Sequence, residues 1–406
     1  MNTKIISGSL ALASTMSLLF TSCETHNYYG DKPAGMVKSA QSAQSGNEAK
    51  IAQIIEMKKN GIISEQEAMK MIDRVMVADS TPAPKPAPEP AKAPVTTVAK
   101  SAPKPAEGGN LNLPDYQPSS KLTSTLRSIG SDSMDRMMQL WEAEFKQFHP
   151  TLKFNHEGKG SSTAIPALLE GKSDVGPMSR KLKSSEIAKF KAKFGYEPVQ
   201  FRVAVDALAV YIHPDNPLVN SGLTLKQLDA IFSQTRQRGG NTAKTWGDLG
   251  LKGEWEKAPI KVYSRNSASG TYGFFKSKVL LKGEYKDTNK ELVGSAEVVR
   301  AVASDKFSIG YSGIAYKTPE VELLPLAEDG NTFYKPNEIN AFSGDYPLTR
   351  SLFITLDLKP GKKVSDLHKE FMKYVYSRKG QMIVRQDGYY PVNAYIASQE
   401  LKKLNR

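Results

Sequence analysis

The chain has 406 residues, of which 39% are hydrophobic and 24% are charged, as expected for a soluble protein of two or three domains. The formal net charge of +13 indicates an anionic partner, unless it reflects only dispersed lysines that keep the surface soluble. No stripe of basic residues alternates with aromatic ones, which argues against nucleic acid as that partner. The only cysteine, Cys23, excludes internal disulfides and any zinc site built from cysteines.

Residues 1–23 are typical of a secretory signal peptide. Lys4 precedes an apolar run over residues 5–20, which is too short to favour a membrane-spanning helix, and Thr21 and Ser22 lead to Cys23. This end resembles a bacterial lipobox, although Phe20 stands where Leu is usual. The resemblance implies that Cys23 is lipidated and that the protein is a membrane-anchored lipoprotein of the periplasm or cell surface. An ordinary signal peptide with an incidental cysteine is the alternative.

Residues 24–80 form a polar segment in which a small helical hairpin is expected. Helical spacing runs from Ile51 to Gly61, and Ser64 with Glu67 forms a capping box for a second helix. The pair weakly resembles the SHOCT helical hairpin, and a marginal helix within a tether is the alternative. Residues 81–118 form a linker rich in Pro and Ala, which predicts a stiffened spacer.

From residue 119 onward, strands are expected to alternate with helices. Met134, Met137, Met138 and Trp141 follow the i, i+3, i+4, i+7 spacing of an amphipathic helix. We expect strands over 126–129, 152–154, 174–178 and 201–212, and helices over 134–148, 165–169 and 184–194. This rhythm predicts a parallel sheet with crossover helices, whose binding loops gather at the carboxyl ends of the strands.

The second half of this region repeats the rhythm. We expect helices over 225–232, 272–279 and 364–376, and strands over 260–263, 308–311 and 352–354. Because about 290 residues are many for one sheet, we expect two α/β lobes with a ligand cleft between them. The expected boundaries place lobe I at about 119–212 and 343–406, and lobe II at about 213–342.

Three short loops rich in small residues each lie between an expected strand and an expected helix, at 130–133, 158–163 and 264–271. Each would place backbone N–H groups and hydroxyls at the positive end of a helix, where oxyanions bind. Three such loops, the last with Arg265, indicate one anion held from several sides. A surface salt bridge is the alternative for Arg265, and simple helix capping is the alternative for Ser161 and Ser162.

The ordered set of loops resembles the phosphate-binding proteins of bacterial phosphate ABC importers, from about Lys121 to Arg406. The flanking matches include Ile309-Gly310-Tyr311 and Tyr346-Pro347-Leu348. The resemblance implies a two-lobed periplasmic-binding-protein fold of type II, no metal or other cofactor, no catalytic role, and a permease partner. It also implies that phosphate is bound by Ser131, Asp132, Ser133, Ser161, Ser162, Ser179, Arg180, Arg265, Ser269, Gly270 and Thr271.

One position departs from the family pattern. The family usually has an Asp after the strand that follows the second loop, where it accepts the proton of HPO₄²⁻. Here Ser179 and Arg180 follow that strand. We expect Asp132 to be the proton acceptor instead, with an N-cap of the following helix as its alternative role. Arg180 is expected to be either a second anion donor or a salt bridge that closes the lobes.

Four other functions are weaker alternatives. A P-loop is excluded because Pro166 stands where the first glycine before Gly171-Lys172-Ser173 belongs. A phosphatase would need a metal cluster or an activated nucleophile, and the five histidines lack the spacing of metal ligands. A receptor for sulfate or molybdate and a structural surface lipoprotein remain open.

Overall fold

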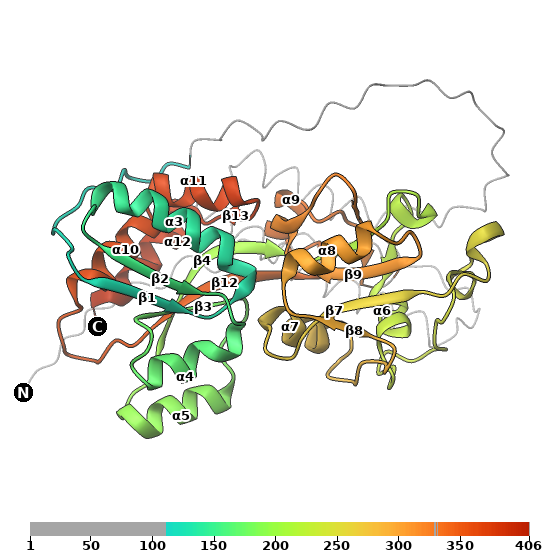
Figure 1. Ribbon diagram of the computed structural model, residues 1–406, viewed down its shortest axis with the longest axis horizontal. Coiled ribbons are helices and arrows are strands. Elements are labelled where there is room, and N and C mark those ends of the chain that lie inside the picture. Colours follow the sequence, from blue (N-terminus) through green and yellow to red (C-terminus); the bar gives the residue numbers. More distant parts are fainter. Residues whose placement is uncertain (1–110, 329, 331, 406) are drawn as a thin grey trace, which may run out of the picture. The chain divides into compact units, whose positions relative to one another are not determined.

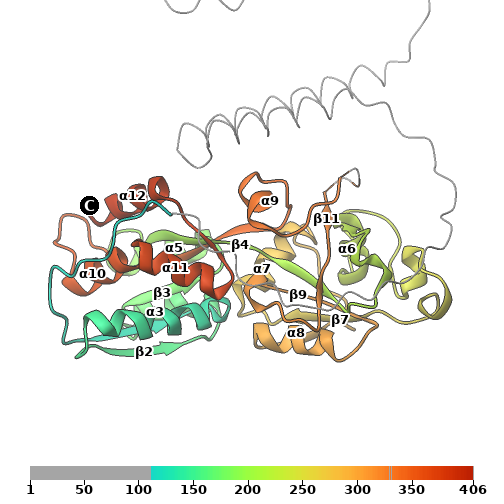
Figure 2. The same cartoon turned by 90° about the horizontal axis from the view of Figure 1, so that it is seen from above.

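The computed structural model describes residues 111–328, 330 and 332–405. The expected signal peptide, the lipidation site Cys23, the helical hairpin and most of the linker lie outside these residues. The structure has two lobes, each built around one mixed β-sheet with helices on both faces (Figures 1 and 2).

The first lobe contains a six-stranded sheet in the order β13-β4-β12-β3-β1-β2. Its strands are β1 (Thr125–Ile129), β2 (Lys153–Glu157), β3 (Val175–Met178), β4 (Val199–Ala207), β12 (Thr349–Leu356) and β13 (Tyr390–Pro391). Its helices are α3 (Asp135–Phe148), α4 (Ala164–Leu169), α5 (Ser184–Phe194), α10 (Asp366–Val375), α11 (Arg378–Asp387) and α12 (Ala394–Lys402). Figure 1 shows α3 and α11 on one face of this sheet and α4 and α5 on the other.

The second lobe contains a five-stranded sheet in the order β10-β5-β9-β7-β8, beside a small two-stranded sheet of β11 and β6. Its strands are β5 (Ala209–Ile212), β6 (Leu223–Thr224), β7 (Lys261–Arg265), β8 (Lys290–Leu292), β9 (Ser308–Ser312), β10 (Glu322–Leu323) and β11 (Leu326–Ala327). Its helices are α6 (Leu225–Phe232), α7 (Gly270–Lys278), α8 (Ser295–Ala303) and α9 (Glu338–Phe342). Helix α6 begins with a capping box, in which Thr224 accepts from the N–H of Gln227.

Helix α3 illustrates how the sequence pattern builds the core. Its spaced apolar residues Met137, Met138, Trp141 and Phe145 are all fully buried against the first sheet and the C-terminal helices. The indole N–H of Trp141 donates to the carbonyl of Gly380 at 2.8 Å, so this large side chain is buried without leaving its polar group unpaired. The helix is therefore anchored in the core of the first lobe directly after the first loop.

Two expectations about the sheets were wrong. The apolar run 201–212 is not one strand, because the chain passes at Leu208 from β4 of the first sheet to β5 of the second. The sheets are also not purely parallel: β12 pairs antiparallel with both β3 and β4, and β5 pairs antiparallel with β9. A return strand buried on both faces has the same composition as a parallel one, so its direction is not visible in the sequence.

The crossing at Leu208 lies beside a second chain segment that also leads from one lobe to the other. The N–H of Leu208 donates to the carbonyl of Leu348 at 2.9 Å, and the hydroxyl of Tyr346 donates to the carbonyl of Leu208 at 2.9 Å. These hydrogen bonds hold the two connecting segments side by side. We call residues 206–209 and 346–350 the hinge segments.

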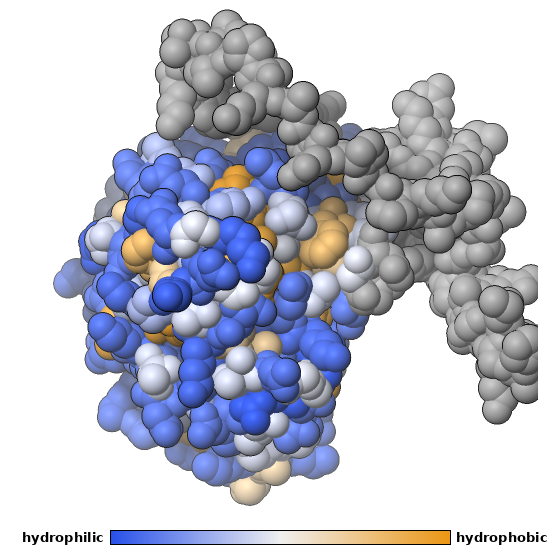
Figure 3. Space-filling model, turned by 90° about the vertical axis from the view of Figure 1, so that its right-hand side faces the viewer, coloured by the Kyte–Doolittle hydropathy of each residue, from blue (hydrophilic) through white to orange (hydrophobic). Residues whose placement is uncertain are grey.

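The face of the molecule drawn in Figure 3 is mostly hydrophilic, with small and separate hydrophobic areas. Within the described part of the chain, no helix is both long and apolar enough to span a bilayer.

The end of the expected linker 81–118 belongs to the first lobe, to which a buried polar cluster ties it. The hydroxyl of Tyr116 donates to Glu370 at 2.8 Å and also lies 2.7 Å from Nε2 of His149. Since the hydroxyl proton is used on Glu370, Nε2 of His149 must carry a hydrogen and donate to the phenol oxygen. Nδ1 of His149 is then buried without a hydrogen-bond partner. Burial lowers the pKa of His149, because the charged ring would lose its hydration, and the charge of Glu370 opposes this shift.

This cluster predicts a loss of stability in mild acid. A histidine whose folded pKa lies below its unfolded value near 6.5 takes up a proton on unfolding, so the free energy of unfolding falls as the pH drops through that value. In urea titrations at about pH 7.5 and about pH 5, His149→Phe should show a smaller difference between the two pH values than the wild type. His368, whose pKa burial also lowers, is unchanged in both proteins. An equal difference in both would contradict the assignment.

Candidate functional site

The three loops meet at the carboxyl ends of their strands. The first loop follows β1, the second follows β2, and the third follows β7 of the other lobe. The N–H of Gly160 donates to the carbonyl of Gly130 at 2.7 Å, which joins the first two loops. The N–H of Ser162 donates to the carbonyl of Ala268 at 3.1 Å, which joins the second and third loops across the lobes.

Two glycines permit this close approach. Gly160 has a φ of 101°, and a Cβ there would lie 2.6 Å from the carbonyl oxygen of Ala268. A Cβ at Gly270 would lie 2.4 Å from Oγ of Ser161 and 2.5 Å from Oγ of Ser179. The start of α7 in the second lobe therefore faces the serines of the first lobe at a distance that excludes any side chain.

Arg265 forms a buried ion pair between the lobes. Its side chain is 1% exposed, and Nη1 lies 2.7 Å from Oδ2 of Asp132. Nη1 also donates to Oγ of Ser295 at 2.7 Å, and Ser295 donates in turn to Oδ2 of Asp132 at 3.0 Å. Nη2 donates to the carbonyl of Val293. Arg265 is thus not the surface salt bridge considered as an alternative.

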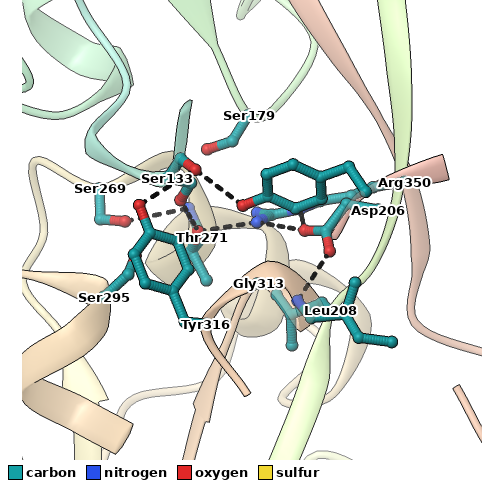
Figure 4. A network of polar contacts seen from close by, with 12 residues as sticks. Ser133, Ser179, Asp206, Leu208, Ser269, Thr271, Ser295, Gly313, Tyr316 and Arg350 are labelled. Carbon is teal, nitrogen blue, oxygen red and sulfur yellow. Dashed lines mark hydrogen bonds and ion pairs between the residues drawn. The ribbon is translucent and has the colours of Figure 1, made fainter. Parts of the chain in front are cut away.

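Hydroxyl groups from both lobes lie in hydrogen-bonding contact (Figure 4). Oγ of Ser133 is 2.8 Å from Oγ1 of Thr271, which joins the first and third loops. Oγ of Ser161 accepts from the N–H of Ser179 at 2.9 Å. Ser269 is the N-cap of α7 and accepts from the N–H of Thr271 at 3.1 Å.

The capping alternatives do not hold. Neither Ser161 nor Ser162 caps a helix, because the N-caps there are Gly160 and Thr163 and neither makes a side-chain cap bond. Asp132 is not an N-cap either: it lies inside the first turn, after Ser131, and its Oδ2 is occupied by Arg265 and Ser295.

Arg180 lies in the first lobe, paired with Glu186 of the same lobe at 2.7 and 2.8 Å. This pairing is not the lobe-closing salt bridge that we considered. Nη2 of Arg180 also lies 3.4 Å from Oγ of Ser162, at the edge of hydrogen-bonding distance. A contact between Arg180 and an anion stays a prediction.

The structure adds an ion pair that our sequence analysis missed. Nε of Arg350 donates to Oδ2 of Asp206 at 2.8 Å, and Nη2 of Arg350 donates to Oγ1 of Thr271 at 2.9 Å. The side chains are 2% and 0% exposed. Burial raises the pKa of Asp206, and the charge of Arg350 opposes that rise. A buried Asp and Arg in two apolar strands were the available signal, because a charge in such a strand requires a partner.

Several polar atoms in this region are buried without a hydrogen-bond partner. They include Oγ of Ser131, Oδ1 of Asp132 and Nη1 of Arg350. Buried polar atoms are almost always paired, so this group indicates that a polar ligand or water completes the site.

The positive charges of the arginines at the site are matched by carboxylates of the protein itself. Each of the three guanidinium groups, on Arg180, Arg265 and Arg350, is paired with a carboxylate. Among residues 111–328, 330 and 332–405, no cluster of His, Cys, Asp and Glu could hold a metal ion. An anion bound here would therefore be held by hydrogen-bond donors and helix ends more than by excess positive charge.

Comparison with known proteins places the chain in a family. Residues 115–379 match the family model described as a PBP superfamily domain. The phosphate-binding protein PstS of Pseudomonas aeruginosa is 46% identical over 294 residues, which cover 72% of this chain and 90% of that protein. PstS of Staphylococcus haemolyticus is 27% identical over 289 residues, covering 70% and 86% of the two chains.

Solved structures agree on the fold. A putative phosphate ABC transporter substrate-binding protein with bound phosphate from Clostridium perfringens has a TM-score of 0.56 at 24% identity, over 66% of this chain and all of its own. An ABC-type phosphate transport receptor from Vibrio cholerae has a TM-score of 0.52 at 22% identity, with 66% and 100% coverage. The relatives are named as binding proteins and not as enzymes, as expected from the sequence. With its α/β fold of two lobes, the chain belongs to the PBP superfamily and, within it, to the family of PstS phosphate-binding proteins.

Proposed function

We propose that this protein binds inorganic phosphate in an interlobe cleft, where the three loops converge, and delivers it to an ABC permease. The observation that carries the proposal is the meeting of loops from both lobes around buried polar atoms that lack partners, among them Oγ of Ser131 and Oδ1 of Asp132. The 46% identity to a protein named as a phosphate-binding protein supports the same ligand.

The residues at this place suit a dehydrated tetrahedral oxyanion. The hydroxyls of Ser131, Ser133 and Thr271 can donate from both lobes, and the helical turns that begin at Asp132 and at Gly270 place the positive ends of their dipoles beside the same loops. Phosphate has four oxygens to accept these bonds. The predicted contacts of Ser161, Ser162, Ser179, Ser269 and Gly270 complete the set, and no metal is required.

Asp132 supplies the selectivity in this proposal. Its Oδ2 is held by Arg265 and Ser295, while its buried Oδ1 has no partner. An ionised carboxylate next to a dianion is tolerable only if a proton lies between them. HPO₄²⁻ has such a proton and sulfate at neutral pH does not, so Oδ1 would accept a hydrogen bond from phosphate and repel sulfate.

The transport role requires that the protein act outside the cytoplasm. The signal-like residues 1–23 and Cys23 support export and lipid anchoring, and the proline-rich linker would hold the binding domain away from the membrane. A receptor for another oxyanion, such as sulfate or molybdate, is the second candidate, because Ser179 stands where the family carboxylate is usual.

Removal of the interlobe cation should weaken phosphate binding. Arg265→Ala leaves Asp132 buried without its partner, which typically costs about 2–5 kcal/mol, so the affinity should fall at least tens-fold. Isothermal titration calorimetry with phosphate measures the change, with Arg378→Ala as a matched control that removes an exposed ion pair to Asp115. Equal affinities for Arg265→Ala and wild type would remove Arg265 from the site.

Replacement of the proposed proton acceptor should change selectivity. Asp132→Asn exchanges an oxygen that only accepts for an amide that also donates, so sulfate should bind the variant while the wild type rejects it. Calorimetric titrations of phosphate, sulfate, arsenate and molybdate into both proteins measure this. Wild-type protein that binds sulfate as tightly as phosphate would replace our proposal with a general oxyanion receptor.

Loss of the proposed lipid should release the protein from membranes. An acylated Cys23 carrying several chains anchors far more firmly than a single acyl chain does. Cys23→Ala should therefore move the protein from the membrane pellet to the soluble fraction, as measured by fractionation and immunoblotting. Cys23→Ala protein that stays in the pellet would show that another segment is the tether.

A further inference from the structure

The Arg350–Asp206 pair lies where the two hinge segments meet. Asp206 precedes the crossing at Leu208, and Arg350 follows Leu348, to which Leu208 is hydrogen-bonded. Nη2 of Arg350 lies 2.7 Å from Oδ2 of Asp206, and the other oxygen, Oδ1, accepts from the N–H of Ile314 in the second lobe at 3.1 Å. One carboxylate therefore connects both hinge segments to the loop after β9 (Figure 4).

The same guanidinium reaches the candidate anion site. Nη2 of Arg350 donates to Oγ1 of Thr271 at 2.9 Å, and Oγ1 of Thr271 lies 2.8 Å from Oγ of Ser133. A guanidinium can only donate, so the oxygen of Thr271 must accept at this contact. The proton of Thr271 is then free to point toward Ser133 or toward an anion. In both cases the chain of hydroxyls delivers a donor, and not an acceptor, to the site.

Two further facts mark Arg350 as more than a structural ion pair. Its Nη1 is buried and has no hydrogen-bond partner, whereas its Nε and Nη2 donate to Asp206 and Thr271. The carbonyl of Ser133 accepts from the hydroxyl of Tyr389 at 2.7 Å, and the carbonyl of Asp132 accepts from the hydroxyl of Tyr316 at 2.9 Å, so the backbone here is fixed while the hydroxyl of Ser133 remains adjustable. Among these contacts, Arg350 is the charged group that orients the hydroxyl of Thr271, and Thr271 in turn contacts the hydroxyl of Ser133.

We propose that Arg350, held by Asp206, is a positioning residue that orients the hydroxyls of Thr271 and Ser133 as donors and couples the hinge segments to the anion. The inference rests on the proposed binding of phosphate at this site. Its consequence is kinetic: oriented donors and a fixed hinge stabilise the closed, liganded protein, so their loss should act mainly on the rate of phosphate dissociation.

The experiment is a double-mutant cycle on the full-length protein, with phosphate as ligand. Arg350→Gln should weaken phosphate binding at least ten-fold, mostly through faster dissociation measured by stopped-flow fluorescence. If Arg350 acts through Thr271, the effect of Arg350→Gln should become several-fold smaller in a Thr271→Val background, because the hydroxyl to be oriented is gone. Arg378→Gln removes an exposed guanidinium paired with Asp115 and should leave both rates unchanged.

Equal fold-losses from Arg350→Gln in the two backgrounds, or a loss confined to association, would overturn the proposal. Failure of the wild type to bind phosphate would instead overturn the proposed function, so the two failures are distinct. If Arg350→Gln does not fold, hydrogen exchange of the wild type decides: phosphate should slow exchange in residues 204–212 and 346–352, and unchanged exchange there would contradict the coupling.

Discussion

A charge taken out of water needs an opposite charge beside it, and the candidate site is arranged around that constraint. Arg265 is buried against Asp132 of the other lobe, Arg350 against Asp206, and Arg180 against Glu186. Because each of these three guanidinium groups already has its carboxylate, they offer no excess positive charge to an incoming dianion. The site instead offers hydroxyls, N–H groups and helix ends. These donors favour a tetrahedral anion whose oxygens and protons fit their arrangement.

The same constraint bears on how the lobes close. The Asp132–Arg265 pair joins the lobes, yet a buried ion pair adds little net stability, since desolvation offsets most of its attraction. On our proposal the bound anion shifts the equilibrium between open and closed lobes toward the closed form. It does so because it accepts hydrogen bonds from both lobes at once, which is possible only when the lobes meet. In the hinge pair Asp206–Arg350, the guanidinium of Arg350 donates a hydrogen bond to Thr271 of the candidate site. Through this contact, the geometry of the hinge segments depends on whether an anion is bound.

The sequence predicted the features whose signals lie in neighbouring residues of the chain. The loops after β1, β2 and β7 were visible because small residues stand between apolar strands and periodic helices, and the structure brings these loops together. The split of the run 201–212 was not visible, since an apolar strand has no periodic signal that marks a change of sheet at Leu208. Arg350 was missed because its partners Asp206 and Thr271 are 144 and 79 residues away along the chain. The antiparallel pairing of β12 with β4 places Arg350 opposite Asp206, and the start of α7 brings Thr271 to the same guanidinium.

The most direct test is a crystal structure of the protein with arsenate, whose arsenic atom is located by anomalous scattering and whose shape and proton content match those of phosphate. Our account predicts one arsenic peak between the lobes, with arsenate oxygens in hydrogen-bonding contact with Oγ of Ser131 and Oδ1 of Asp132, and with the first turn of α7. A peak elsewhere, or none at saturating arsenate, would contradict it.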